Sequence, residues 1–126
     1  MDKRVEQWFM QAEYDLDTAE CMLQGGRCFY AVFMAHLAIE KALKGVWQAK
    51  LRDAPPKTHS LVYLVEKLGL TPPAEVDEFL VTLNSASVAT RYPDDLQKMI
   101  ASYSEAGTRR LLDNSREALA WIKTQQ

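Results

Sequence analysis

The strongest constraint on how this chain folds is a helical repeat of apolar residues close to its N-terminus. Apolar side chains recur there at spacings of three and four residues, with mostly acidic or amide side chains between them. The repeat consists of Val5, Trp8, Phe9, Ala12, Leu16, Ala19 and Leu23. Residues with this spacing line one face of a helix with 3.6 residues per turn. The sequence therefore predicts an amphipathic helix that ends at Gly25 and Gly26, because glycine commonly terminates helices.

A second helix is predicted from about Arg27 to Arg52, with a different distribution of apolar residues. Its first half is apolar on almost every side, and its second half is amphipathic and basic. A helix that is apolar all round belongs in the middle of a bundle or at a subunit interface. Pro55 and Pro56 follow and mark the end of the helical segment.

Two more helices are predicted between the paired prolines and residue 90. Thr58 is positioned to cap a short third helix, which stops at Gly69. Thr71, followed by Pro72 and Pro73, has the cap-plus-proline pattern of a helix start. We therefore expect a short helix and then a longer one in this region.

The remaining sequence predicts one more helix and completes the fold class. The turn at residues 91–95 interrupts the helical pattern, because Pro93 disfavours helical geometry at the residue before it. Ser102 and Glu105 have the spacing of a capping box and open the last helix. No segment shows the sustained alternation of a strand. The predicted fold is all-α, an up-and-down bundle of four longer helices plus one short helix, in a single domain over residues 1–126.

Composition excludes several classes of function. The net charge of −2 argues against one large basic surface for duplex nucleic acid. The longest apolar stretch is far shorter than a membrane span, and the N-terminus leads into amphipathic sequence rather than a signal-peptide core. We therefore expect a cytoplasmic protein without a membrane partner. Cys21 and Cys28 form no zinc-ligand pattern, so neither a metal nor a cofactor is expected.

One candidate site is a row of ionisable residues on the predicted second helix. His36, Glu40 and Lys44 are spaced by four residues, with Lys41 adjacent. This spacing stacks three ionisable groups on one side of an otherwise apolar helix. One interpretation is a Glu–Lys pair near the surface that contributes a few tenths of a kcal/mol. The other is that Glu40 orients an arginine from the turn at residues 91–95.

The turn at residues 91–95 is the second candidate site. Arg91 offers a planar guanidinium suited to a carboxylate or phosphate. Tyr92 offers an aromatic ring and a hydroxyl, and Asp94 and Asp95 are acceptors. These residues fit a ligand-binding turn, but they also fit a loop in which the aspartates cap the next helix and Arg91 pairs with Glu40.

His59 is a third candidate, near the start of the predicted short helix. Histidine is the usual general base at neutral pH, and His59 follows Thr58 in a capped first turn. A histidine in that position also fits a purely local structural role. Asp94 and Asp95 with Glu105 have no fixed metal-ligand spacing, so we expect no metal there.

Several short motifs, taken in order, resemble the HEPN family of prokaryotic helical domains. They are Ala12–Leu16 with Ala19, Phe29–Tyr30, Ala38–Lys44, Thr58–Leu61 and Arg91–Asp94. The motifs extend over nearly the whole chain, and their order and spacing carry the likeness. The Arg-Tyr-Pro-Asp sequence of the last motif suggests a stand-alone HEPN protein of the type that contains this tetrapeptide.

This resemblance implies a bundle of four to five helices that forms a homodimer. It also implies a partner, because HEPN proteins often function beside a minimal nucleotidyltransferase as a toxin–antitoxin-like pair. Many members are metal-independent ribonucleases with an arginine followed four to six residues later by a histidine. In those members two protomers bring both motifs to one cleft.

The chain departs from the ribonuclease motif at its histidine. Arg91 matches the arginine, but positions 95–98 read Asp-Leu-Gln-Lys, and no histidine follows His59. Metal-free RNA cleavage needs a group that accepts the 2′-hydroxyl proton and a group that protonates the leaving oxygen. An ordinary aspartate is a poor acid at neutral pH, and an ordinary tyrosine is a poor base.

We therefore expect a non-catalytic HEPN module that binds a nucleotide or an RNA phosphate, a nucleotidyltransferase partner, or both. The predicted ligand-binding residues are Arg91, Tyr92, Asp94, Asp95, Glu40, Lys41 and Lys44. One alternative is a ribonuclease that uses Arg91 with Tyr92, Asp94 or His59. The other is a purely structural dimerisation module in which Arg91 pairs with Glu40.

Overall fold

A computed structural model of the chain describes residues 2–91 and 96–126, with the side chains of residues 87–91 and 99 left aside. The described residues form six helices and contain no strand. The helices are α1 (Lys3–Gln24), α2 (Cys28–Leu51), α3 (Leu61–Lys67), α4 (Ala74–Arg91), α5 (Leu96–Ser102) and α6 (Glu105–Lys123). The all-α prediction with four longer helices is confirmed. The second short helix, α5, was not predicted.

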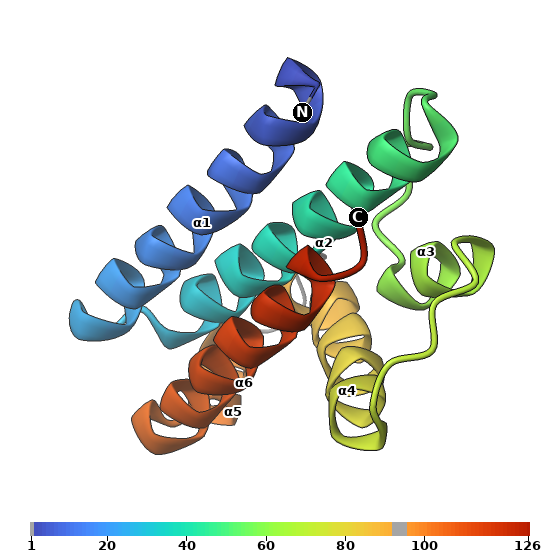
Figure 1. The fold of residues 1–126 in the computed structure, drawn as a ribbon. Coiled ribbons are helices and arrows are strands. Elements are labelled where there is room, and N and C mark those ends of the chain that lie inside the picture. Colours follow the sequence, from blue (N-terminus) through green and yellow to red (C-terminus); the bar gives the residue numbers. More distant parts are fainter. Residues whose placement is uncertain (1, 92–95) are drawn as a thin grey trace.

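Helix α2 is the central element of the bundle. It contacts α1, α3, α4, α5 and α6. Figure 1 shows α1 antiparallel to α2, α6 beside them and antiparallel to α1, and α4 crossing the other helices at a steep angle. The buried residues of α2 include four alanines without measurable exposure, Ala31, Ala35, Ala38 and Ala42. The apolar first half of this helix is thus explained by its position in the middle of the fold.

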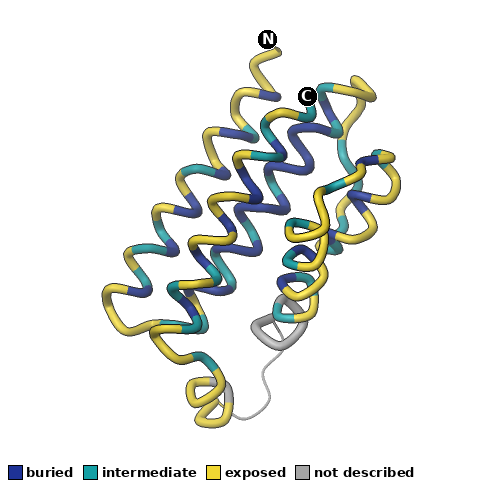
Figure 2. Tube along the Cα trace, turned by 60° about the horizontal axis from the view of Figure 1, so that its bottom comes forward, coloured by how far each residue is buried: buried dark blue, intermediate teal, exposed yellow. Residues whose placement is uncertain are grey.

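The apolar repeat at the N-terminus is buried as the sequence predicted. Every member except Trp8 has an exposed fraction below a tenth, and Ala12, Leu16 and Ala19 are fully buried. Figure 2 shows the resulting alternation of buried and exposed positions along this helix. Burial of this stripe against α2 and α6 fixes the position of α1 and leaves its polar face outward.

Two helix caps differ from the predicted ones. Helix α3 is capped by Ser60, whose Oγ accepts a hydrogen bond from the backbone N–H of Tyr63. Thr58 instead accepts from the N–H of Ser60. Helix α6 is capped by Ser104, and Ser102 is the last residue of α5. Serine and threonine both make good caps, so the tertiary course of the chain decides which neighbouring position is used.

None of the helices in the described ranges is both long enough and apolar enough to cross a membrane.

Candidate functional site

The candidate site centres on Glu40, which lies in the middle of α2 and is only 3% exposed. Its two carboxylate oxygens have different partners. Oε2 accepts a 3.2 Å hydrogen bond from Lys44 Nζ, one turn further along the same helix. Oε1 lies 3.0 Å from His59 Nδ1, which comes from the segment between α2 and α3. We call Glu40, Lys44 and His59 the Glu40 cluster.

The ion pair between Glu40 and Lys44 is buried. Lys44 is 8% exposed as a whole residue, so both members of the pair are largely removed from water. The sequence predicted the pair from its spacing, but the interpretation as a pair near the surface is wrong about its burial. Moving two charges out of water costs several kcal/mol per ion, and their attraction often does no more than offset that cost. Fold stability alone therefore does not explain this pair.

The position of His59 depends on how the segment between α2 and α3 is held against α4. The N–H of Leu61 donates a 2.7 Å hydrogen bond to Asn84 Oδ1 in α4, which ties the start of α3 to that helix. The side chain of His59 is 59% exposed although its Nδ1 contacts a buried carboxylate. The imidazole therefore connects the buried carboxylate with solvent. Its contact with Glu40 spans 19 residues of sequence, so its role is not confined to a local turn.

His36 and Lys41 lie on α2 beside the cluster but differ from its members. His36 is 1% exposed, and its Nδ1 lies 3.8 Å from Glu40 Oε1. Lys41 instead forms an ion pair of 2.8 Å with Asp15 of α1. The structure thus engages Lys41 in the packing of α1 on α2, while Lys44 stays with Glu40.

The predicted residues of the 91–95 turn fall mostly outside the described part of the chain. Tyr92, Asp94 and Asp95 are not among the described residues, and neither is the side chain of Arg91. The backbone of Arg91 is the last helical position of α4. It follows Asn84 by seven residues, which corresponds to about two turns and ~10 Å along the helix. The end of α4 therefore lies two helical turns beyond Asn84, which binds the start of α3 next to His59.

The chemistry available to the Glu40 cluster is proton transfer and anion binding. A carboxylate that accepts from Nδ1 orients an imidazole and selects which of its nitrogens faces outward. Within the described residues, no group of three or more His, Cys, Asp or Glu side chains is arranged to hold a metal ion.

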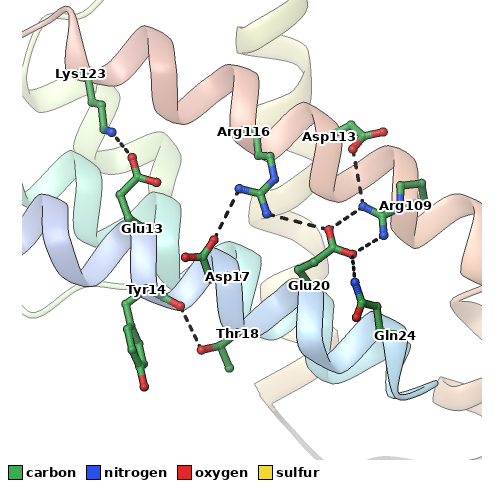
Figure 3. A network of polar contacts seen from close by, with 10 residues as sticks. All are labelled: Glu13, Tyr14, Asp17, Thr18, Glu20, Gln24, Arg109, Asp113, Arg116 and Lys123. Carbon is green, nitrogen blue, oxygen red and sulfur yellow. Dashed lines mark hydrogen bonds and ion pairs between the residues drawn. The ribbon is translucent and has the colours of Figure 1, made fainter.

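A second polar network joins α1 to α6 and was not predicted. Glu13 pairs with Lys123, Asp17 with Arg116, and Glu20 with both Arg109 and Arg116. We call these six residues the α1–α6 ladder, and Figure 3 shows them bridging the two helices. A sequence signal was present. The acids of α1 are spaced by four and three residues, and the bases of α6 are spaced by seven.

The contact between Glu20 and Arg109 in the α1–α6 ladder is bidentate. The guanidinium donates two hydrogen bonds to the carboxylate, one of them 2.6 Å from Arg109 Nη1 to Glu20 Oε1. This hydrogen bonding lowers the pKa of Glu20 from its usual value of 4.5. The same contact raises the pKa of Arg109. Both shifts favour the charged forms, so this region is a matched set of ions at neutral pH.

A pocket of about 220 Å³ lies where α2 begins and α5 passes over it. It is lined mainly by aromatic and aliphatic side chains, including Phe29, Tyr30, Leu96, Ile100 and Tyr103. Burial raises the pKa of Tyr103. The rings of Phe29 and Tyr30 are stacked with centroids 4.3 Å apart. In the sequence this aromatic pair forms one of the motifs that carry the family resemblance, and the pocket was not predicted.

Comparison with known proteins places the chain in a family. The HEPN domain profile matches residues 5–125. The chain belongs to the HEPN family. The crystal structure of TT1696 from Thermus thermophilus superposes with a TM-score of 0.83 at 26% identity, over 98% of each chain. ST0689, an archaeal HEPN homologue, superposes with a TM-score of 0.78 at 31% identity, over 99% of this chain and 98% of its own.

No curated protein matches the sequence. The predicted HEPN membership is confirmed, whereas the subtype with the Arg-Tyr-Pro-Asp tetrapeptide stays a prediction.

Proposed function

We propose that this HEPN domain is a phosphate-binding module whose ligand is a nucleotide or an RNA strand. The observation that carries the proposal is the buried Glu40, which holds a lysine and an exposed histidine at one place on the central helix. The proposed ligand contacts are His59 at the surface and Arg91 at the end of α4, with Lys44 contributing positive charge behind them.

The energetics of the Glu40 cluster support a functional role. Replacing a buried ion pair by apolar residues of similar volume is often neutral or stabilising. Buried charged groups that are held by specific partners are therefore candidates for a functional site. The α2 helix has apolar residues at most of its other buried positions, so the charged pair is the exception within it.

The expected position of Arg91 supports the same site. Arg91 lies on α4 two turns after Asn84, and Asn84 bonds the backbone two residues after His59. An arginine there would offer a bidentate contact to a phosphate, which a lysine cannot provide with the same geometry. Tyr92, Asp94 and Asp95 remain predicted contacts of this ligand.

We also expect this protein to form a homodimer in the cytoplasm and to work with a minimal nucleotidyltransferase. Support for a protein contact comes from Tyr30, Leu96 and Ile100, each about half exposed around the pocket at the start of α2. Grouped exposed apolar residues commonly mark interaction surfaces. Light scattering tests the dimer, and a strictly monomeric protein at micromolar concentration would contradict it.

Binding of a labelled RNA strand tests the proposed function. A fluorescein-labelled single-stranded RNA is titrated with wild-type protein, Arg91→Ala and Arg110→Ala, and the anisotropy is followed. Arg110 is an exposed arginine of α6 outside the Glu40 cluster, so it is a matched control. We expect Arg91→Ala to weaken binding about tenfold, which corresponds to the loss of one charge-assisted contact. We expect Arg110→Ala to bind like the wild type.

The salt dependence of the same titration separates a specific contact from a general loss of charge. Removing one phosphate contact lowers the slope of log Kd against log salt by about 0.7 for a single strand. Equal binding by the two variants, or no binding of RNA or ATP by the wild type, would refute the proposal. Wild-type binding by Arg91→Ala with a lowered melting temperature would favour the structural dimerisation module instead.

A further inference from the structure

We propose that an open pocket between the start of α1 and the end of α2 is a base-binding subsite, in which Trp8 stacks on a base of a single-stranded RNA. We call it the Trp8 pocket, and its lining consists of Lys3, Arg4, Gln7, Trp8, Gln11 and Gln48. The inference rests on the proposed function, because it needs an RNA strand as the ligand. It adds a second contact to that function, since the Glu40 cluster binds phosphate and the Trp8 pocket binds a base.

Trp8 is the exception in the apolar repeat of α1. The other six members are buried, whereas Trp8 stays partly exposed. Its Cβ is held close to α2, because a Cβ added at Gly45 would lie only 3.1 Å from it. Its indole N–H donates a 3.0 Å hydrogen bond to Gln48 Oε1. An aromatic side chain that is fixed at both ends and partly exposed is a platform on which a base can stack.

The hydrogen bond from Trp8 determines what Gln48 offers to the pocket. An indole nitrogen only donates, so the carbonyl oxygen of the Gln48 amide faces Trp8. The NH2 end of the amide donates to no residue in the described part of the chain, although Gln48 is only 7% exposed. Buried polar groups are normally hydrogen-bonded. A buried amide with two unused donors at a pocket therefore fits a ligand that brings an acceptor, such as a carbonyl oxygen of a base.

The rim of the Trp8 pocket carries positive charge. Lys3 and Arg4 are both exposed, and neither forms an ion pair with a residue that the structure describes. Among the described residues, no acid lines the pocket. The bases of the α1–α6 ladder, by contrast, are each paired with an acid. The charge beside Trp8 is therefore available to the phosphates that flank a stacked base.

The size and position of the pocket fit one nucleotide of a longer strand. Its volume of about 400 Å³ is within the range of small-ligand sites. Gln48 continues the four-residue spacing of Glu40 and Lys44 along α2, so Lys44 and Gln48 are one turn, ~6 Å, apart along the helix axis. Neighbouring nucleotides of one strand can span that separation. Stacking also needs an unpaired base, which a single strand offers and a duplex does not.

Binding of strands with and without bases tests this inference. Two fluorescein-labelled strands of equal length and charge are titrated with the full chain, a short single-stranded RNA and an abasic strand with the same ribose-phosphate backbone. We expect the abasic strand to bind wild-type protein about tenfold more weakly, because the stacked base is lost. Equal affinity for the two strands would overturn the Trp8 pocket as a base subsite.

Substitutions of Trp8 separate stacking from packing. Trp8→Phe keeps an aromatic face, and Trp8→Leu keeps apolar bulk without one. We expect Trp8→Leu to bind the RNA about tenfold more weakly and Trp8→Phe to bind within about threefold of wild type. Trp121→Leu is the matched control, because Trp121 is a partly buried tryptophan of α6 outside the pocket, and it should bind like wild type. A purely structural role of Trp8 predicts the same loss for both strands, whereas stacking predicts a loss for the RNA alone.

Tryptophan fluorescence gives a second readout that does not depend on Trp8→Leu being folded. A base stacked on an indole quenches its emission. We therefore expect the RNA to quench wild-type protein, the abasic strand to leave its emission unchanged, and Trp8→Phe to lose most of the quenching. Quenching that is undiminished in Trp8→Phe, or unchanged RNA affinity in folded Trp8→Leu, would overturn the subsite.

The outcomes distinguish this inference from the proposed function. RNA binding that is weakened by Arg91→Ala but not by Trp8→Leu would overturn the Trp8 pocket and leave the proposed function standing. No RNA binding by the folded wild-type protein would overturn both.

Discussion

The Glu40 cluster and the α1–α6 ladder both pair acids with bases, but they differ in their access to water. The α1–α6 ladder lies on the outer surface, where its arginine and lysine side chains are about two-fifths exposed. In the Glu40 cluster, the carboxylate and the ammonium are buried, and only His59 faces solvent. Placing charged side chains therefore costs little free energy in the exposed α1–α6 ladder and much more in the buried Glu40 cluster.

In a small helical bundle, buried charged groups carry more information about function than exposed ion pairs do. Exposed ion pairs form readily between any two helices with complementary charge, so they carry little information about function. A charged group inside the central helix must be compensated by specific partners or it destabilises the fold. Glu40 has those partners, and one of them leads to the surface.

The largest effect is expected from breaking the buried pair. Lys44→Ala leaves the Glu40 carboxylate buried without its ammonium, and removing one partner of such a pair costs about 3 kcal/mol of unfolding free energy. Lys50→Ala is the matched control, because Lys50 is an exposed lysine at the end of the same helix. We expect the control to change stability by less than about 0.5 kcal/mol. Urea unfolding measures both values.

Equal unfolding free energies for the two lysine variants would contradict the proposed difference between buried and exposed ion pairs. They would mean that water or another residue compensates Glu40, and that the pair is energetically a surface pair.

A smaller effect is expected from breaking the bidentate contact of the α1–α6 ladder. Arg109→Ala removes both hydrogen bonds to Glu20, and we expect a small decrease in melting temperature at pH 7. Arg110→Ala, at the next position of α6, has no described ion pair and should melt like wild type. A decrease in melting temperature as large as that caused by Lys44→Ala would contradict the proposed energetic difference between the α1–α6 ladder and the Glu40 cluster.

Lowering the pH makes the effect of Arg109→Ala smaller still. The pKa of Glu20 is lowered in the folded state, so the unfolded chain binds more protons as the pH falls below 4.5. The stabilisation by this pair is therefore complete above pH 4.5 and is lost as the pH falls through the lowered pKa of Glu20. The melting temperatures of wild type and Arg109→Ala should converge in acid. A difference that stays constant down to about pH 3 would show that the contact is not ionic.

The helices were predictable because their apolar periodicity is strong, but the exact caps were not. Ser102 and Ser104 both suit an N-cap, and the choice of Ser104 depends on α5, whose exposed Leu96 and Ile100 gave no amphipathic signal. Sequence spacing predicts local contacts well and contacts that depend on the path of a loop poorly.

The candidate site divides in the same way. The pair of Glu40 with Lys44 follows from helical spacing and was predicted, although its burial depends on tertiary packing. The contact of His59 with Glu40 depends on how residues 52–60 return along α2, which no local pattern encodes. The α1–α6 ladder could have been found from the matched spacing of its acids and bases.

An RNA titration followed through the imidazole resonances by NMR tests most directly whether the Glu40 cluster faces the phosphate ligand. The chain has only two histidines, so the ring C–H resonances of His59 are assigned by comparison with His59→Ala. A 2′-O-methyl RNA strand is added, because it binds without offering a hydroxyl for cleavage. We expect the His59 resonances to shift, with half of the total shift reached at the midpoint of the anisotropy titration. Fixed His59 resonances while the RNA binds would contradict it.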